Sequence, residues 1–276
     1  MISGLDSASL KIVRAKEHLE AIKKIIRSLA SANSYEIVKD ASGKEKIHFL
    51  IQPPPQIAIL AGEVVYQLRS ALDHLAFDLV QCNASNITLP TNWCKLCDFP
   101  LWPTISDAMI RRGYTHPPLP YNCFTKSLPG ISKAAFEFIE GVQPYRSGTG
   151  PHNVMRLIAQ LSNIDRHRYL NVTLPKATQY HYLVLTEGRQ YAYGRGGLKD
   201  GAEIEDLPPK AGDIVDVQRS FSTYVTFDEP AVGTGPETLE VEHVLEVCLE
   251  QVERVILPAF IQLLKKPEFT GEKHLD

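Results

Sequence analysis

A long helical pattern at residues 56–81 constrains the fold of this 276-residue chain more than any other feature. When each residue is rotated by about 100 degrees from the one before, the apolar side chains fall within a single arc. That arc predicts a central helix with one buried face. Its members are Ile57, Leu60, Ala61, Val64, Leu68, Ala71, Leu72, Leu75 and Leu79.

Helix and strand patterns alternate along the rest of the chain. Residues 5–31 have apolar side chains at helical spacing. Two β-type runs, 34–39 and 46–51, flank the turn sequence DASGKE and predict a hairpin. Residues 170–228 carry short aromatic and β-branched runs bounded by Gly or Pro, which favour strands. Further helices are expected at residues 131–142, 153–170 and 237–266.

These elements predict the α+β class, with long helices packed with an antiparallel sheet formed by the N-terminal hairpin and the strands from 170–228. We expect one domain over residues 1–276, because no loop separates two parts that could each build a core. Residues 83–130 are expected to form a long irregular insertion with one short helix near 104–112. Residues 267–276 are expected to be a flexible tail.

The composition excludes several broad classes of protein. The net charge of −3 gives no global basic field, so any contact with RNA or DNA would have to use a local patch. The sequence starts with an amphipathic helix pattern rather than a signal peptide, and no run of apolar residues is long enough to span a membrane. We therefore expect a soluble, cytoplasmic protein with no membrane partner.

The five cysteines do not indicate a disulfide framework, because their number is odd and no secretion signal is found. Cys94 and Cys97 have the spacing of metal ligands, and Cys82, His116 and Cys123 could complete a zinc site. No second close pair accompanies them, so free thiols are favoured, and we predict neither a metal nor a cofactor.

The polar face of the helix at 56–81 is organised into two stripes. One stripe holds Glu63, Gln67, Ser70 and His74, and the stripe beside it holds Tyr66, Arg69 and Asp73. Two interpretations are open. The face could meet water, with Arg69 and Asp73 as a surface ion pair of about 0.3–0.5 kcal/mol. Alternatively, it could line a cleft in which His74 acts as an acid–base group.

A second polar cluster lies in the sequence LSNIDRHRYL, residues 161–170. Asp165 and Arg168 continue the apolar stripe of their helix, so both charges would point inward and need partners, whereas His167 points elsewhere. The alternative is that the helix ends near Asp165 and its charges fan into solvent. We predict that the two clusters meet, with Asp165 near Arg69 and Arg168 near Asp73.

The segment Arg69-Ser-Ala-Leu-Asp-His74 resembles the Arg-x4–6-His motif of the HEPN superfamily of small helical domains, many of which are metal-independent ribonucleases. The resemblance implies that Arg69 would stabilise phosphate charge and that His74 would hold or activate the ribose 2′-hydroxyl. It also implies RNA or a phosphate-containing ligand as partner, and a homodimer, because the active site of that family is usually built at a dimer interface.

The segments LRSALDHLA, GVQPY and NIDRHRYL together also resemble an uncharacterised bacterial protein family, and this resemblance implies no activity. Two functions therefore remain open. The first is HEPN-like RNA cleavage or another phosphoester reaction. The second is a non-catalytic ligand- or protein-binding module whose polar clusters are structural ion-pair networks. The candidate catalytic residues are Arg69, Asp73, His74, Asp165, His167 and Arg168.

Overall fold

The computed structural model describes residues 3–31, 34–83, 88–89, 91–102, 127–146, 153–185, 190–204, 214–228 and 240–265. Within these ranges the chain forms helices and antiparallel sheets, which confirms the predicted α+β class. The chain divides into two compact units. Unit 1 comprises Met1–Leu19, Leu60–Tyr169 and Val244–Asp276, and unit 2 comprises Glu20–Ile59 and Leu170–His243. Helices α1 (Gly4–Ser31) and α2 (Pro55–Asn83) contribute residues to both units.

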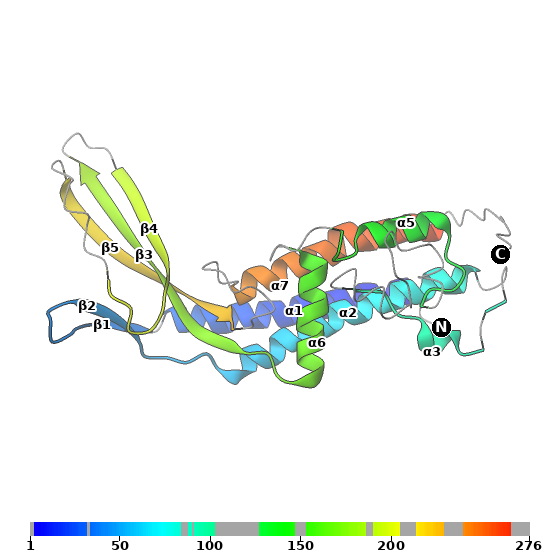
Figure 1. The fold of residues 1–276 in the computed structure, drawn as a ribbon, viewed down its shortest axis with the longest axis horizontal. Helices are drawn as coiled ribbons and strands as arrows, with labels where there is room; N and C mark the ends of the chain where they lie inside the picture. Colours follow the sequence, from blue (N-terminus) through cyan, green and yellow to red (C-terminus); the bar gives the residue numbers. More distant parts are fainter. Residues whose placement is uncertain are drawn as a thin grey trace. The chain divides into compact units, whose positions relative to one another are not determined.

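Unit 1 is helical in its described part. Beside its parts of α1 and α2 it contains α3 (Trp93–Leu96), α5 (Lys133–Gly141), α6 (Val154–His167), most of α7 (Val241–Glu250), η2 (Gln251–Ile256) and α8 (Leu257–Lys265). Figure 1 shows α6, in green, crossing α2. The ring of Phe260 packs between Phe99 and Phe138, with ring centroids 6.0 and 5.9 Å apart.

The buried face of α2 is the one that the periodicity predicts. Leu68, Leu72 and Leu75 are fully buried. The buried arc is wider than predicted, because Val65 and Ala76 are also fully buried. Helix α2 is therefore a central element of the core, and the rest of its surface is half-buried or exposed and carries its polar residues.

Helix α6 has well-defined ends, and these ends fix which of its polar residues belong to the helix. Asn153 is the N-cap, since its side chain accepts a 3.0 Å hydrogen bond from the Arg156 amide and donates one of 2.5 Å to the Pro144 carbonyl. The helix ends at His167, and Arg168 follows with extended backbone (φ −162°, ψ 165°). The helix thus continues past Asp165 but does not include Arg168.

In unit 2, β1 (Tyr35–Lys39) and β2 (Glu45–Phe49) form the predicted hairpin, with Tyr35 opposite Phe49. The turn is set by two residues of the predicted turn sequence. Asp40 Oδ1 accepts hydrogen bonds from the amides of Ser42 (2.8 Å) and Lys44 (3.2 Å), and Gly43 adopts φ +82°, a conformation that favours glycine.

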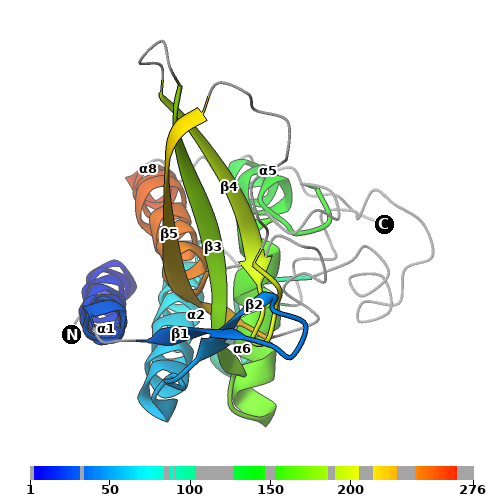
Figure 2. The same ribbon diagram turned by 90° about the vertical axis from the view of Figure 1, so that its left-hand side faces the viewer.

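The strand region of residues 170–228 forms its own sheet rather than joining the hairpin. Strand β3 (Val172–Leu185) lies between β4 (Gln190–Leu198) and β5 (Ile214–Phe227), and all pairs are antiparallel (Figure 2). The expectation of one continuous sheet is therefore wrong. An isolated antiparallel bridge between Lys46 and Glu203 links β2 to the segment after β4 instead.

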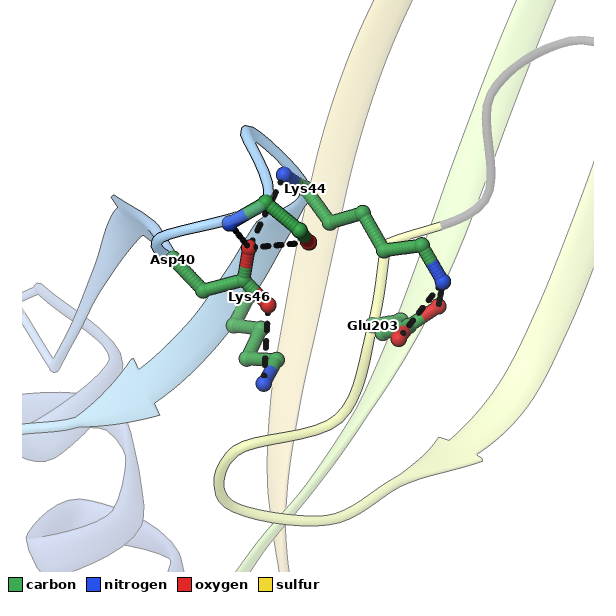
Figure 3. A network of polar contacts seen from close by, with 5 residues as sticks. Asp40, Lys44, Lys46 and Glu203 are labelled. Carbon is green, nitrogen blue, oxygen red and sulfur yellow. Dashed lines mark hydrogen bonds and ion pairs between the residues drawn. The ribbon is translucent and has the colours of Figure 1, made fainter.

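The segment 200–204 adds backbone and side-chain contacts along β2. The Ile47 amide donates to the Ala202 carbonyl (3.1 Å), and the Gly201 amide donates to the Ile47 carbonyl (2.8 Å). Ile47, Leu198 and Ile204 form a small buried core at this place. Ion pairs on the surface join Lys44 to Glu203 (2.9 Å) and Lys46 to Asp40 (3.1 Å), as Figure 3 shows.

Several expectations fall outside the described residues. The short helix near 104–112 and the tail at 267–276 lie there, and so does most of the irregular insertion at 83–130. The described part of that insertion contains the short helix α3 and the segment from Cys97 to Trp102, which has no regular secondary structure. That all 276 residues fold as one domain stays a prediction.

Candidate functional site

A cavity of about 560 Å³ lies in unit 1 between α2, α6 and the segment 98–102. We call it the α2–α6 cleft. A volume of this size lies within the range of small-molecule binding sites, which is roughly 300–1,000 Å³. It is lined by Tyr66, Arg69, Ser70 and Asp73 of α2, Asp98, Leu101 and Trp102 of the segment, and Ala159, Gln160, Ser162, Asn163, Asp165 and Arg166 of α6.

Arg69 and Asp73 form one wall of the cleft, where both side chains bind the backbone of Phe99. We call this arrangement the clasp. Arg69 Nη2 donates a 2.7 Å hydrogen bond to the Phe99 carbonyl, and Asp73 Oδ1 accepts one of 2.9 Å from the Phe99 amide. The two side chains are one helical turn apart and 3.3 Å from each other. They therefore bind both polar backbone groups of Phe99, while the Phe99 ring is fully buried.

The charges of the clasp are not balanced. Arg69 Nη2 also lies 3.7 Å from Asp98 Oδ2, so one guanidinium forms ion pairs with two carboxylates. Burial raises the pKa of Asp73 above its ordinary value, and the Arg69 charge and the Phe99 amide only partly oppose that effect. A negative charge on Asp73 is thus less favourable in the folded protein than in water.

His74 does not line the cleft. Its Nδ1 lies 2.8 Å from the hydroxyl of Ser7 in α1. One turn further along α2, the Asp78 carboxylate accepts hydrogen bonds from the amides of Gly4 (3.0 Å) and Leu5 (2.7 Å), which are otherwise unpaired at a helix start. His74 and Asp78 therefore attach the first turn of α1 to α2, and Arg69 and His74 serve different partners.

Asp165 lies where α6 crosses α2. A Cβ atom added to Gly62 would be 2.2 Å from Asp165 Oδ1, so only glycine allows the carboxylate to lie against the α2 backbone at this place. Burial raises the pKa of Asp165, and the negative charge of Glu63 raises it further. Glu63 is in turn paired with His18 of α1, whose Nε2 is 3.0 Å from Glu63 Oε2.

The predicted pairs between the two clusters are wrong. Arg69 contacts Asp73, Asp98 and Phe99, not Asp165. Arg168 is exposed and donates a 3.4 Å hydrogen bond to the Tyr169 carbonyl, because it lies beyond the end of α6 instead of on its apolar stripe. His167 is also exposed and does not line the cleft.

The two clusters nevertheless border the same cavity. Arg69 and Asp73 line it from α2, and Asp165 lines it from α6. Three of the six candidate residues are thus brought to one site, and the other three, His74, His167 and Arg168, are not among its lining residues.

Sequence reasoning missed part of the lining. Ser162 and Arg166 lie on the polar side of α6, and the same rotation that gave its apolar stripe could have assigned them. Asp98 and Trp102 come from a segment without regular secondary structure or periodicity, so no signal in the sequence indicated which way they face.

Among the described cysteines there is no metal-site geometry. In the described part of the chain, no group of three or more His, Cys, Asp or Glu residues could hold a metal ion. Cys94 is exposed, and burial raises the pKa of the Cys97 thiol to about 12. His116 and Cys123, the other zinc ligands considered from the sequence, lie outside the described residues.

Comparisons with protein-family models, with curated proteins and with solved structures give no match to this chain. Over the residues that the structure describes, no helix combines the length and apolar character that crossing a membrane requires.

Proposed function

We propose that the protein is a non-catalytic binding module that takes a small polar ligand in the α2–α6 cleft, and that Arg69, Asp73 and His74 are structural residues. The observation that carries the proposal is the clasp on Phe99, because it engages the charged ends of Arg69 and Asp73 with the protein's own backbone. The cleft keeps other polar lining groups, among them Ser70, Ser162 and Asn163.

The position of His74 is a second observation that favours a non-catalytic protein. A catalytic histidine must reach the proton that it transfers, at about 2.6–3.2 Å. The Nδ1 of His74 is engaged with Ser7 of α1, and the residue does not line the cavity. Residues five apart on a helix differ by roughly 140 degrees in direction, so Arg69 and His74 are poorly arranged to act on one phosphodiester.

The test is a ligand screen followed by amide chemical shifts in NMR spectra of the whole chain. We expect ligands to shift the amide signals of Tyr66, Ser162 and Asn163, and Ser162→Trp to abolish these shifts by filling the cavity. His167→Trp is the matched control, since His167 lies exposed on the same helix outside the cavity. Shifts that persist in Ser162→Trp, or none with any compound, would refute the proposal.

HEPN-like RNA cleavage, with an RNA or phosphate-containing ligand and a homodimer, is the second candidate. Arg69 favours it, because this residue of the Arg-x4-His segment does line the cleft. An RNA-degradation assay separates the candidates. Catalysis predicts that His74→Ala loses activity and that Ser7→Ala, which removes the same hydrogen bond but keeps the imidazole, retains it. The binding-module proposal predicts that the wild-type protein does not cleave RNA, and a structural His74 predicts that both variants lose similar stability.

A further inference from the structure

The described residues that line the α2–α6 cleft include more negative than positive side chains, and one of the positive side chains is already paired. Among the described residues of the lining, three carboxylates, Asp73, Asp98 and Asp165, face two guanidinium groups, Arg69 and Arg166. Arg69 is already engaged by Asp73, Asp98 and the Phe99 carbonyl. A phosphate or carboxylate ligand would have to compete with these groups for Arg69 and would meet their negative charge.

Arg166 does not offset this imbalance at Asp165. Its side chain is exposed, and its Nη2 donates a 3.3 Å hydrogen bond to Asn163 Oδ1. In the part of the chain that the structure describes, the Asp165 carboxylate forms no ion pair and accepts no hydrogen bond, and the nearby charge that acts on it is that of Glu63. Asp165 is therefore a half-buried carboxylate without a cation.

The aromatic lining of the cleft also suits a cation. Tyr66 is 58% exposed, and the ammonium of Lys11 lies 5.4 Å from the centre of its ring. That distance is within the range of a cation–π contact, so the Tyr66 ring is placed as a cation-binding ring would be. Ser70, Ser162 and Asn163 supply hydroxyl and amide groups that can accept hydrogen bonds from an N–H donor.

An organic cation fits better than a metal ion. Hard metal ions take roughly six to eight oxygen ligands close together, whereas the described residues contain no cluster of three metal-ligating side chains. The cavity of about 560 Å³ is also much larger than one ion requires. A molecule with a carbon skeleton and a charged nitrogen would use both the volume and the carboxylate.

We infer that the ligand of the α2–α6 cleft is a small organic cation with an ammonium or guanidinium group, which binds to the Asp165 carboxylate beside the Tyr66 ring. This inference rests on the proposed function and specifies the class of ligand. The bound cation donates hydrogen bonds to Asp165, and its charge offsets the negative charge that Asp165 and Glu63 hold close together.

The test uses four probes of matched length and different charge: 1,5-diaminopentane, 5-amino-1-pentanol, 1,5-pentanediol and glutarate. Titrations of the whole chain are followed by the amide signals of Tyr66, Ser162 and Asn163. We expect both amines to bind and the diol and the dicarboxylate not to bind. Asp165→Asn should weaken amine binding by roughly tenfold or more, because the ammonium loses a hydrogen bond to a charged acceptor.

Asp165→Asn is expected to fold, because burial disfavours the negative charge that the substitution removes. A melting curve by circular dichroism verifies this. The matched control is Asp228→Asn, which removes an exposed carboxylate outside the cleft and should leave amine affinity unchanged. Equal amine affinity in Asp165→Asn and in the wild-type protein would overturn the inference.

The outcomes separate this inference from the proposed function. If glutarate, the diol or any neutral compound of the screen shifts the cleft signals and the amines do not, the inference fails and the cleft remains a binding site. If no compound shifts these signals, both fail. Amine binding that is lost in both Asp165→Asn and Ser162→Trp, but kept in Asp228→Asn and His167→Trp, supports both.

Discussion

Asp165 of α6 lies against Gly62 of α2, with its Oδ1 2.2 Å from the place that a Cβ atom on residue 62 would take. This relationship makes the two positions depend on each other. Alanine in a helix interior is about 1 kcal/mol more favourable than glycine, but here its methyl group would displace the carboxylate. The geometry of the cleft wall is thus kept at a cost in helix propensity.

A double-mutant cycle tests this dependence. Gly62→Ala should raise the free energy of unfolding by about 1 kcal/mol in an Asp165→Ala background, where no carboxylate is in the way. In the wild-type background the change in unfolding free energy caused by Gly62→Ala should be less favourable than in the Asp165→Ala background. The difference should be roughly 0.5–3 kcal/mol, the usual coupling energy of residues in contact. Urea unfolding measures both. Equal effects in the two backgrounds would contradict the close contact.

Leu72→Ala tests the core of unit 1. Leu72 is fully buried on α2, so its truncation should lower the free energy of unfolding by roughly 2–5 kcal/mol. Ile59→Ala on the same helix is the control, because Ile59 is 62% exposed and its loss should cost little. A loss at Leu72 that is no greater than the loss at Ile59 would mean that the buried face is assigned wrongly.

Arg69→Ala tests the clasp. The substitution leaves the Phe99 carbonyl without its 2.7 Å donor and leaves Asp73 and Asp98 without their guanidinium. We expect a loss of about 1–3 kcal/mol in urea unfolding, the cost of an unsatisfied buried group. Arg166→Ala, which removes an exposed guanidinium on α6, should be nearly neutral. Similar stability of the two variants would argue against a structural role for Arg69.

The lowered pKa of Asp40 predicts that the stability of unit 2 depends on pH. The Ser42 hydroxyl and the Lys46 ammonium hold the pKa of Asp40 well below the ordinary value of 3.8. Because the folded pKa is depressed, the stabilising contribution is present above pH 3.8 and is lost as the pH falls toward the folded pKa. Asp40→Asn keeps an acceptor for the turn amides but loses the charge.

The readout is the difference in melting temperature between the wild-type protein and Asp40→Asn. That difference should be largest near neutral pH and should shrink as the pH is lowered below about 4. Other acidic groups titrate in both proteins, so the comparison isolates Asp40. A difference that stays constant from neutral pH to about pH 2 would contradict the charge-based contact with Lys46.

The sequence predicted the buried face of α2 because apolar burial follows the helical repeat, as Leu68 and Leu72 show. It also indicated that Arg69 and Asp73 lie on an organised polar face. Their partner could not be predicted, since the Phe99 backbone offers no side-chain signal and lies in a segment without periodicity.

Arg168 shows a second limit of sequence reasoning. The rotation that put it inside the protein assumed that the helix continues, whereas α6 ends one residue earlier and turns into extended backbone. His74 shows a third limit. Its contact with Ser7 joins residues 67 positions apart, and neither periodicity nor a short motif predicts which distant helix packs against a polar face.

The clasp on Phe99 has a consequence for how this region can vary between related sequences. Arg69 and Asp73 bind only the backbone of residue 99, so they make no demand on the identity of its side chain, which the apolar interior selects separately. Proline is excluded at this position, because it lacks the amide that Asp73 requires. Positions 69 and 73 are expected to covary with each other, and substitution patterns at position 99 should follow volume and hydrophobicity alone.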